Sequence, residues 1–339
     1  MRKALTVTVI ILFLQTMFFV FIPLNTHTAA AATTVPGGDI TVDTWWDLGG
    51  SPWIIEGNVY VKNGVNLTID PGVVVEFNGT GGGEYGLYIT NGTLRAHGTP
   101  GARIWFTAHK STTPENWTGI QVDAAGNDIG RVEMDHCNIT YAKYALTVNG
   151  APNNTVSNTN ISDCYDGIRL YDSYNNTISD TNISDNFNFG IYLSESWNTT
   201  ISNCRIYENW YNGVHLYRSY DNTIIENNIS NNLFRGIFGA GSSGMETEDN
   251  DITFNHISAN GDGIRFQSFA RNNNITRNNI SWNTGYGIHC SGSQNIDNRI
   301  YHNIFWNNTV QANDTGGGNI WDNGYPSGGN YWSDFDEAG

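Results

Sequence analysis

From Ala151 onward the sequence repeats itself about every 23 residues, and this period restricts the fold more than any other feature. Two aliphatic columns lie five residues apart, and a third column is a glycine followed by an aliphatic residue. The first column is Val156, Ile178, Ile201, Ile224, Ile252 and Ile275, and the second is Ile161, Ile183, Ile206, Ile229, Ile257 and Ile280. The third is Gly167-Ile168, Gly190-Ile191, Gly213-Val214, Gly236-Ile237, Gly263-Ile264 and Gly287-Ile288. A period in this range indicates a solenoid.

The local pattern within each repeat is that of strands. Each apolar patch is short and alternates with polar residues, as in Ile168-Arg169-Leu170, which is typical of a strand with one buried face. No ten-residue window has helical spacing, which excludes the helical repeat families, and the leucine-rich pattern L-x-x-L-x-L is missing. Three short strands per repeat predict an all-β fold, a right-handed parallel β-helix of about ten coils with roughly 22–23 residues per coil.

Stacking of such coils would pile the isoleucines into one continuous core. It would also align an asparagine column three residues after the second isoleucine: Asn186, Asn209, Asn232, Asn260 and Asn283. We expect these amides to form a hydrogen-bonded ladder, with Cys164 taking the same position as a small buried residue in an earlier coil. The register places the four cysteines on different columns, so we expect four free thiols despite the even count: Cys137, Cys164, Cys204 and Cys290.

The remaining segments divide the chain into four parts. Residues 1–32 have a charged start, an apolar run and a small-residue end, so we expect a signal peptide, or alternatively an uncleaved membrane anchor. We expect a tryptophan-rich N-terminal cap over residues 33–58, the β-helix over 59–315, and a C-terminal cap or tail over 316–339. The mature chain would then be secreted, at the cell surface, or in the periplasm of a cell with two membranes.

The composition narrows the range of partners. The formal net charge of −16 disfavours nucleic acid, and it leaves membrane contact to an uncleaved N-terminal segment. Only 14% of residues are charged while 13% are aromatic, which suits a surface that meets sugars or other cell-surface components. Sequons such as those at Asn66 and Asn228 make the chain a candidate glycoprotein, although the repeat itself generates most of them.

Two stretches resemble known families. Residues 56–61 (E-G-N-V-Y-V) and 67–73 (L-T-I-D-P-G-V) are similar to the start of secreted pectate-lyase-like β-helices of archaea and bacteria. The repeats, with W-D-N-G-Y at 321–325 and G-N-Y-W-S-D at 329–334, resemble the NosD-type β-helix family. This resemblance implies a β-helix and allows several activities: surface proteins, carbohydrate-binding modules, sugar lyases or hydrolases, and a periplasmic factor for copper insertion.

Motifs for catalysis are sparse. The sequence has no Asp-Asp pair, Gly-His-Gly, Arg-Ile-Lys or Asp-Pro-His-Asp, which disfavours polygalacturonase-like and epimerase-like sites. An insertion between Phe238 and Ile252 gathers acidic side chains that could bind Ca²⁺, namely Glu246, Glu248, Asp249 and Asp251. With Arg235 and Arg265 nearest in register, this loop would carry the site of a polysaccharide lyase or glycoside hydrolase, which is the alternative function. The histidines are scattered, so a copper-processing role is weakly indicated.

Binding side chains are better represented. An outward column one residue after each Gly-aliphatic pair should project from one flat sheet: Arg169, Tyr192, His215, Phe238, Arg265 and His289. A second aromatic column precedes the N-T-I motif: Tyr174, Trp197 and Tyr220. Aromatic faces stack on sugar rings, and arginine forks bind hydroxyls and carboxylates. The sequence therefore predicts a non-catalytic extracellular module that binds carbohydrate or forms part of a surface layer, with no cofactor other than the Ca²⁺ suggested above.

Overall fold

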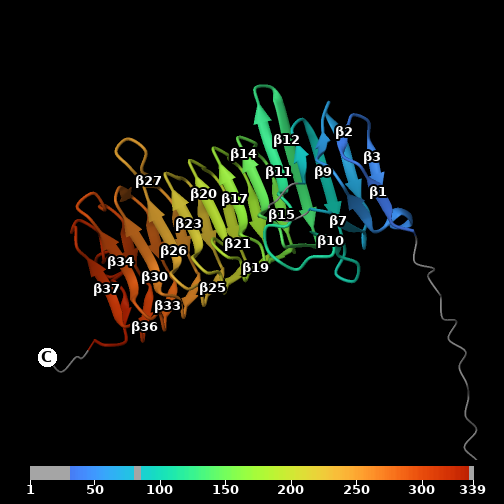
Figure 1. Cartoon of the computed structure of the whole chain (residues 1–339). Coiled ribbons are helices and arrows are strands. Elements are labelled where there is room, and N and C mark those ends of the chain that lie inside the picture. The colour runs from blue at the N-terminus through green and yellow to red at the C-terminus, as the bar shows by residue number, and fades with distance from the viewer. Residues whose placement is uncertain (1–30, 80–84, 336–339) are drawn as a thin grey trace, which may run out of the picture.

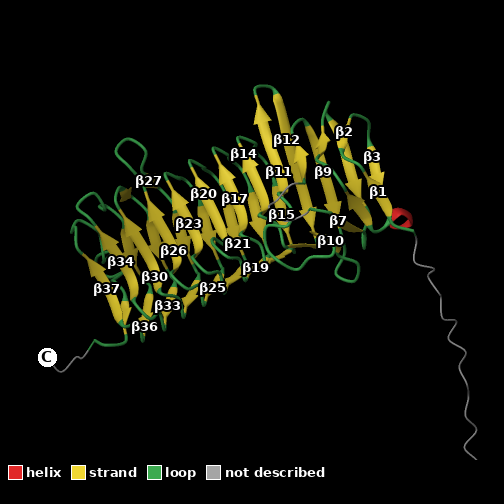
Figure 2. Ribbon diagram, viewed as in Figure 1, coloured by secondary structure: helices red, strands yellow, loops and turns green. Residues whose placement is uncertain are grey.

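Short strands follow one another in a fixed cycle through three parallel sheets, and each cycle forms one coil of a right-handed parallel β-helix. The computed structural model describes residues 31–79 and 85–335. In Figure 1 the coils stack from the N-terminal end, in blue, to the C-terminal end, in red, and give the molecule an elongated shape. Figure 2 shows short strands joined by loops and turns along the described chain, the one helical turn within these residues being η1 (Leu48–Gly50).

Sheet 1 contains thirteen strands in the described residues, so the helix has about thirteen coils rather than the predicted ten. Its strands are β1 (Thr33–Val35), β4 (Trp53–Ile55), β7 (Val74–Phe77), β10 (Ile104–Ala108), β13 (Cys137–Thr140), β16 (Asn160–Ser162), β19 (Asn182–Ser184), β22 (Arg205–Tyr207), β25 (Asn228–Ser230), β29 (His256–Ser258), β33 (Asn279–Ser281), β36 (Ile304–Trp306) and β38 (Tyr331–Trp332).

Sheets 2 and 3 are joined through the antiparallel contact of β11 with β12, which rises above the neighbouring coils in Figure 1. Sheet 2 is β2 (Gly38–Ile40), β5 (Val59–Val61), β8 (Gly86–Ile89), β11 (Gly119–Ala125), β14 (Tyr144–Asn149), β17 (Asp166–Tyr171), β20 (Ile191–Ser194), β23 (Asn212–Tyr217), β26 (Arg235–Ala240), β30 (Asp262–Gln267), β34 (Tyr286–Ser291) and β37 (Val310–Asp314). Sheet 3 is β3 (Thr44–Trp46), β6 (Val65–Ile69), β9 (Gly92–His97), β12 (Asp128–Asp135), β15 (Thr155–Ser157), β18 (Thr177–Ser179), β21 (Thr200–Ser202), β24 (Thr223–Ile225), β28 (Asp251–Thr253), β32 (Asn274–Thr276) and β35 (Arg299–Tyr301).

The three predicted columns pair in register. Ile183 lies opposite Ile161 and Ile206 in sheet 1, and Ile201 lies opposite Ile178 and Ile224 in sheet 3. The isoleucines of both columns are at most 2% exposed, as the stacked-core prediction requires. The burial of these aliphatic side chains supplies the main favourable free energy of folding.

The position before the sheet 2 isoleucine must be glycine, because neighbouring atoms leave no room for a Cβ. A Cβ on Gly236 would lie 2.7 Å from both the carbonyl oxygen of Gly263 and Cγ2 of Ile257, and 2.9 Å from Nδ2 of Asn260. Real Cβ atoms do not approach other atoms so closely, so the coil must carry a glycine where its backbone passes the core and the asparagine column.

Asparagine ladders line all three corners of the coil, whereas the sequence predicted one. The corner between sheets 1 and 2 carries the predicted ladder, in which Asn209 donates to Asn232 Oδ1 over 2.9 Å and Asn232 donates to Asn260 Oδ1 over 3.0 Å. The corner between sheets 2 and 3 carries Asn154, Asn176, Asn222, Asn250, Asn273, Asn298 and Asn319. The corner between sheets 3 and 1 carries Asn227, Asn255, Asn278, Asn303 and Asn330.

The two ends of the chain differ from the predicted caps. Strand β1 pairs with β4, β2 with β5, and β3 with β6, so residues 33–58 form a coil in register with the rest. The predicted boundary at residue 59 therefore lies between two coils of the same helix. At the other end β38 pairs with β36, and Trp332 covers the last coil by stacking on Phe305 at 4.6 Å. The predicted signal segment lies outside the described residues apart from Ala31 and Ala32.

The four cysteines are free and buried, but the predicted register was wrong in one respect. Cys164 occupies the asparagine position at the corner between sheets 1 and 2, and its N–H donates to Asn186 Oδ1, as expected. Cys137 and Cys204, however, share one column at the corner between sheets 3 and 1, with Thr159 and Thr181 between them. Small side chains replace asparagine there in the earlier coils.

The ladders can be tested with two adjacent residues. Asn227 is buried, accepts from the Cys204 N–H at 2.9 Å, and donates to Ile201 O and Asn255 Oδ1 at 2.9 Å each. Asn227→Ala would leave these groups without partners, so we expect the free energy of unfolding to fall by about 3 kcal/mol. The exposed neighbour Asn228, changed to Ala, should alter it by less than about 0.5 kcal/mol. Chemical denaturation measures both, and equal losses would contradict the structural role of the ladder.

The thiols provide a second test. Burial raises the pKa of Cys164 and of Cys204 to about 12, and raises the pKa of Cys137 and Cys290 as well. Because the thiolate is the reactive form, we expect no alkylation of the native protein by iodoacetamide at about pH 8. Four adducts per chain should form in guanidinium without reductant. Mass spectrometry counts them, and fewer than four would reveal a disulfide.

Candidate functional site

The predicted outward column exists as a register in sheet 2. Arg169 pairs with Tyr192, Tyr192 with His215, His215 with Phe238, Phe238 with Arg265, and Arg265 with His289. These six positions therefore lie side by side at strand spacing along the solenoid, about 4.8 Å apart. The sheet gives them a common face, and the residue just before each glycine of sheet 2 supplies a parallel outer row.

The column is packed rather than open. The guanidinium of Arg169 lies over the ring of Tyr144, 4.2 Å from its centroid, and Phe189 stacks on Tyr192 at 5.1 Å. The ring of His215 makes edge contacts with Phe189, Tyr192 and Phe238 at 4.8–5.0 Å between centroids. To bind a ligand along all six residues, these side chains would have to give up the ring-stacking and cation–π contacts that they already make.

Burial among these rings changes the chemistry of His215. Desolvation, and to a smaller extent the nearby positive charge of Arg235, lower the pKa of His215 to about 3. The imidazole is therefore neutral at physiological pH, and it acts as one more ring in the packed face.

The second aromatic column forms a continuous stack. Trp197 lies between Tyr174, at 4.8 Å, and Tyr220, at 5.6 Å, with interplanar angles of 12° and 3°. This stack runs along the outside of the corner between sheets 2 and 3, directly beside a buried serine ladder. Because a ring lies on each of its faces, Trp197 presents its edge to solvent, while Tyr174 and Tyr220 at the two ends of the stack each keep one outer face.

The acidic insertion folds back onto this aromatic stack. The loop leads from β26 into β27 (Thr247–Glu248), which pairs with β31 (Ala270–Arg271), and it projects from the coils in Figure 1. Loop and stack enclose a hollow of about 390 Å³ lined by Asp172, Glu195, Trp197, Arg218, Tyr220, Gly244, Met245, Glu246 and Glu248. The structure thus brings together two of the features predicted separately, the aromatic column and the acidic loop.

The charges around the hollow are arranged in pairs. Arg218 Nη1 lies 3.1 Å from Glu195 Oε1, and Arg271 Nη2 lies 3.2 Å from Glu246 Oε1. Burial, together with Asp249 and Glu246, raises the pKa of Glu248. The arginine that meets the loop is Arg271 rather than Arg235 or Arg265, so the lyase arrangement expected from the sequence is replaced by a different pair.

A calcium site on this loop receives no support from the geometry. Within residues 31–79 and 85–335, no three histidine, cysteine, aspartate or glutamate side chains gather closely enough to hold a metal ion. Of the four predicted ligands, Glu246 is paired with Arg271, and Asp251 accepts a hydrogen bond from Asn274 at 3.0 Å.

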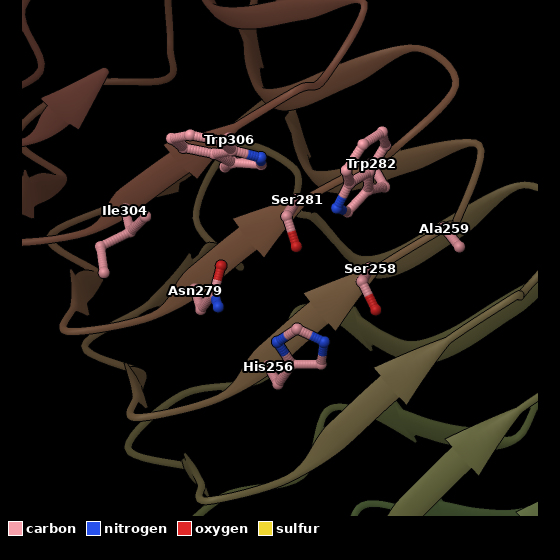
Figure 3. A pocket seen from close by; sticks show the side chains of 8 residues that line it. All are labelled: His256, Ser258, Ala259, Asn279, Ser281, Trp282, Ile304 and Trp306. Atoms are coloured by element: carbon pink, nitrogen blue, oxygen red, sulfur yellow. The ribbon is translucent and has the colours of Figure 1, made fainter. Parts of the chain in front are cut away.

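A further hollow, of about 460 Å³, lies on the outer face of sheet 1 and was missed in the sequence. Figure 3 shows His256, Asn279 and Ile304 in one row on three successive strands, with Ser258, Ser281 and Trp306 in the next row and Trp282 beyond them. Trp282 is 61% exposed and has a φ of 58°, a left-handed conformation that is rare for a bulky side chain. Extending the outward rows of the N-I-S strands along the repeat would have found these residues.

Comparison with known proteins decides the family. The family model described as periplasmic copper-binding protein (NosD) matches residues 85–251 and 239–337. The chain belongs to the NosD family. The crystal structure of the periplasmic alginate epimerase AlgG is similar over 79% of this chain and 74% of its own, with a TM-score of 0.52 and 16% sequence identity. The structure of pectate lyase Pel9A aligns over 76% of this chain and 73% of its own, with a TM-score of 0.41 and 16% identity.

A curated relative shares a shorter segment. Protein bark beetle of Drosophila melanogaster is 37% identical over 84 residues, which is 25% of this chain and 2% of that protein. The NosD-family chain thus spans a small fraction of the length of this relative. At 16% identity the likeness to AlgG shows the fold alone, and it agrees with the β-helix described above.

The family description implies copper, and the donor groups do not fit it. Copper sites need thiolate, thioether or imidazole groups held close together. The four cysteines are buried in the core, and the described residues contain no metal-binding group of three or more histidine, cysteine or acidic side chains. His215 and His289 share a column, but Phe238 and Arg265 lie between them. In this part of the chain no helix is long and apolar enough to cross a bilayer.

The buried imidazole predicts a pH dependence. The pKa of His215 is lower in the folded chain, about 3, than its ordinary 6.5, so protons bind the unfolded state more readily. The stability contributed by the neutral ring is complete above about pH 6.5 and declines as the pH falls toward 3. We expect the fall in unfolding free energy between pH 7 and pH 4 to be about 3 kcal/mol smaller in His215→Phe. Urea titrations at both pH values measure it, and identical falls would contradict the burial.

Proposed function

We propose that this NosD-family chain is a non-catalytic, extracytoplasmic module that binds polysaccharide. The observation that carries the proposal is the hollow at the corner between sheets 2 and 3, where Trp197 and Tyr220 meet acidic and basic side chains. Sugar rings present apolar C–H faces and polar hydroxyl edges, and such a site offers a partner for each. The outer face of Tyr220, at the end of the stack, supplies the platform, while Arg218 and Glu195 supply directional hydrogen bonds.

A non-catalytic role follows from how these groups are engaged. A glycosidase needs one carboxyl held protonated and another ionised close to the same bond. In the hollow, Glu195 and Glu246 each form an ion pair with an arginine. The raised pKa of Glu248 is the one feature that favours the alternative, a lyase or hydrolase.

An extracytoplasmic location is consistent with the periplasmic description of the family and with that of AlgG. It also agrees with the N-terminal signal that the sequence predicts. A surface with few charges and many neutral polar groups suits contact with hydrated polysaccharide.

The platform can be tested with Trp197→Ala. This substitution removes an indole edge that lines the hollow and the ring on which Tyr220 stacks, so it should weaken binding of a hexasaccharide by about 2 kcal/mol, or roughly thirtyfold, when measured by calorimetry across a panel of neutral and acidic hexasaccharides. Trp282→Ala, an exposed tryptophan of the sheet 1 hollow, is the matched control and should bind as the wild type does.

Two outcomes would contradict the proposal. Loss of binding with Trp282→Ala instead of Trp197→Ala would move the site to sheet 1. Release of unsaturated or shortened product from any panel member, abolished by Glu248→Gln, would establish the enzymatic alternative.

A further inference from the structure

Two arginines converge on one aspartate at the start of strands β26 and β30. Arg235 Nε lies 4.0 Å and Arg265 Nη1 lies 3.5 Å from the same oxygen, Oδ2 of Asp262. The other oxygen, Oδ1, accepts the backbone N–H of Tyr286 at 3.0 Å. Register fixes the arrangement, because Arg235 pairs with Asp262 across the ladder, and Arg265 follows Asp262 by three residues.

The cluster carries an excess positive charge. Two guanidinium groups face one carboxylate, and guanidinium does not lose its proton in proteins. His289, beside Arg265 in the next coil, adds no charge at neutral pH, since burial, Arg265 and Arg235 lower its pKa against the opposing effect of Asp262. In a chain with a formal net charge of −16, an unbalanced cation on a packed face needs an explanation.

The same sequence motif elsewhere shows what a balanced site looks like. Asp166-Gly167-Ile168-Arg169 repeats the D-G-I-R motif of residues 262–265, and there Arg169 lies 3.4 Å from Asp166. Asp166 has Tyr144 as its neighbour in the preceding coil, where Asp262 has Arg235. One arginine is therefore enough to neutralise the aspartate of this motif, and Arg235 is the additional feature of the second copy.

The second copy also has space and unused hydrogen-bonding groups. A hollow of about 290 Å³ is lined by Leu233, Phe234, Arg235, Gly261, Asp262, Arg265, Thr284 and Gly285. A Cβ on Gly261 would collide with the carbonyl oxygen of Phe234, and one on Gly285 with Asp262 Oδ1, so the close packing at the wall of this hollow requires glycine at both positions. The Nε atoms of Arg235 and Arg265 have no hydrogen-bond partner, as is also true of Arg169 Nε in the first copy, and Nδ1 of His289, a residue only 9% exposed, has none either.

We propose that this cluster binds the carboxylate of an acidic sugar, so that the polysaccharide recognised by this chain contains uronic acid residues. The inference rests on the proposed function, and it names the class of sugar. A carboxylate in the hollow would balance the second arginine and would accept from the Nη–H groups of Arg235 and Arg265, the geometry that arginine prefers. Phe234, 47% exposed at the rim, offers an apolar surface to the face of the same sugar ring.

The position of the cluster agrees with a ligand that crosses sheet 2. Arg235 begins β26, and the insertion that lines the Trp197 hollow follows the end of the same strand at Ala240. The two sites are therefore separated by one strand length, ~17 Å. An oligosaccharide lying along β26 would meet an aromatic platform at one end and a carboxylate site at the other.

The experiment compares hexagalacturonate and hexamannuronate with their carboxyl-reduced, neutral counterparts, using calorimetry on the full chain at low salt. We expect the wild type to bind at least one acidic oligomer about tenfold more tightly than its reduced form. Arg235→Gln should abolish that preference while leaving the affinity for the reduced oligomer unchanged. Arg235→Lys, which keeps the charge without the fork, should retain part of it. Arg205→Gln, an exposed arginine of sheet 1, removes the same charge elsewhere and should keep the full preference.

Other outcomes would overturn the inference. Equal affinity for acidic and reduced oligomers, or equal behaviour of Arg235→Gln and Arg205→Gln, would exclude carboxylate recognition at this cluster. Equally tight binding of inorganic phosphate, lost with Arg235→Gln, would make it a general anion site. If only the reduced-oligomer affinity survives and Trp197→Ala removes it, the proposed function stands without the acidic specificity; if no oligosaccharide binds at all, both fail. Circular dichroism and thermal unfolding of each variant show whether it is folded.

Discussion

Burial of the corner asparagines is the interaction on which the rest of this structure depends. A coil of three strands must turn three times, and each turn removes backbone N–H and C=O groups from the ladders of the sheets. Asn232 shows how they are satisfied: its Oδ1 accepts from the N–H and amide of Asn209, and its Nδ2 donates to Ile206 O and to Asn260. Because buried polar groups without partners are costly, every coil must place an amide, or a small substitute, at the same three positions.

This requirement explains why the period is constant and why a longer repeat is tolerated at the insertion between β26 and β28. The insertion before β28 adds residues, yet Asn222 still donates to Asn250 at 3.0 Å across it. The ladder therefore stays continuous while the loop leaves the coil, and the core isoleucines Ile224 and Ile252 remain paired. A loop added in this way costs the solenoid little, because stability is carried by contacts between neighbouring coils. The inserted loop can therefore form one wall of the candidate site without disturbing the coil.

The sequence predicted the features that repeat and missed those that do not. The isoleucine columns and the Asn186 ladder could be predicted because identical residues recur at a fixed interval. The other two ladders could not be recognised because other residues, such as Thr181 and Cys204, take the asparagine position in the earlier coils. The column therefore looks irregular in the sequence. Residues 33–58 form a coil without any repeat motif, since Val35 and Ile55 pair in register with different neighbours around them. The packing of the outward column could not be predicted from the sequence either, because it depends on rings such as Tyr144 and Phe189 that lie outside the column itself.

On sheet 2, residues that support the packing of the face can be told apart from residues that are free to bind a ligand. Residues whose neighbours satisfy them, such as His215 among its rings, serve the packing of the face even though the pattern presents them as a binding stripe. Three buried groups without a hydrogen-bond partner, Arg235 Nε, Arg265 Nε and His289 Nδ1, lie where Arg235 breaks the local charge balance, and others lie elsewhere along the solenoid. A buried donor without a partner costs free energy in every molecule that folds, and a ligand that completes the bond offsets that cost. The hollow and the second arginine at the start of β26 are the features that distinguish this part of sheet 2, rather than the full length of the column, as the site proposed for an acidic ligand.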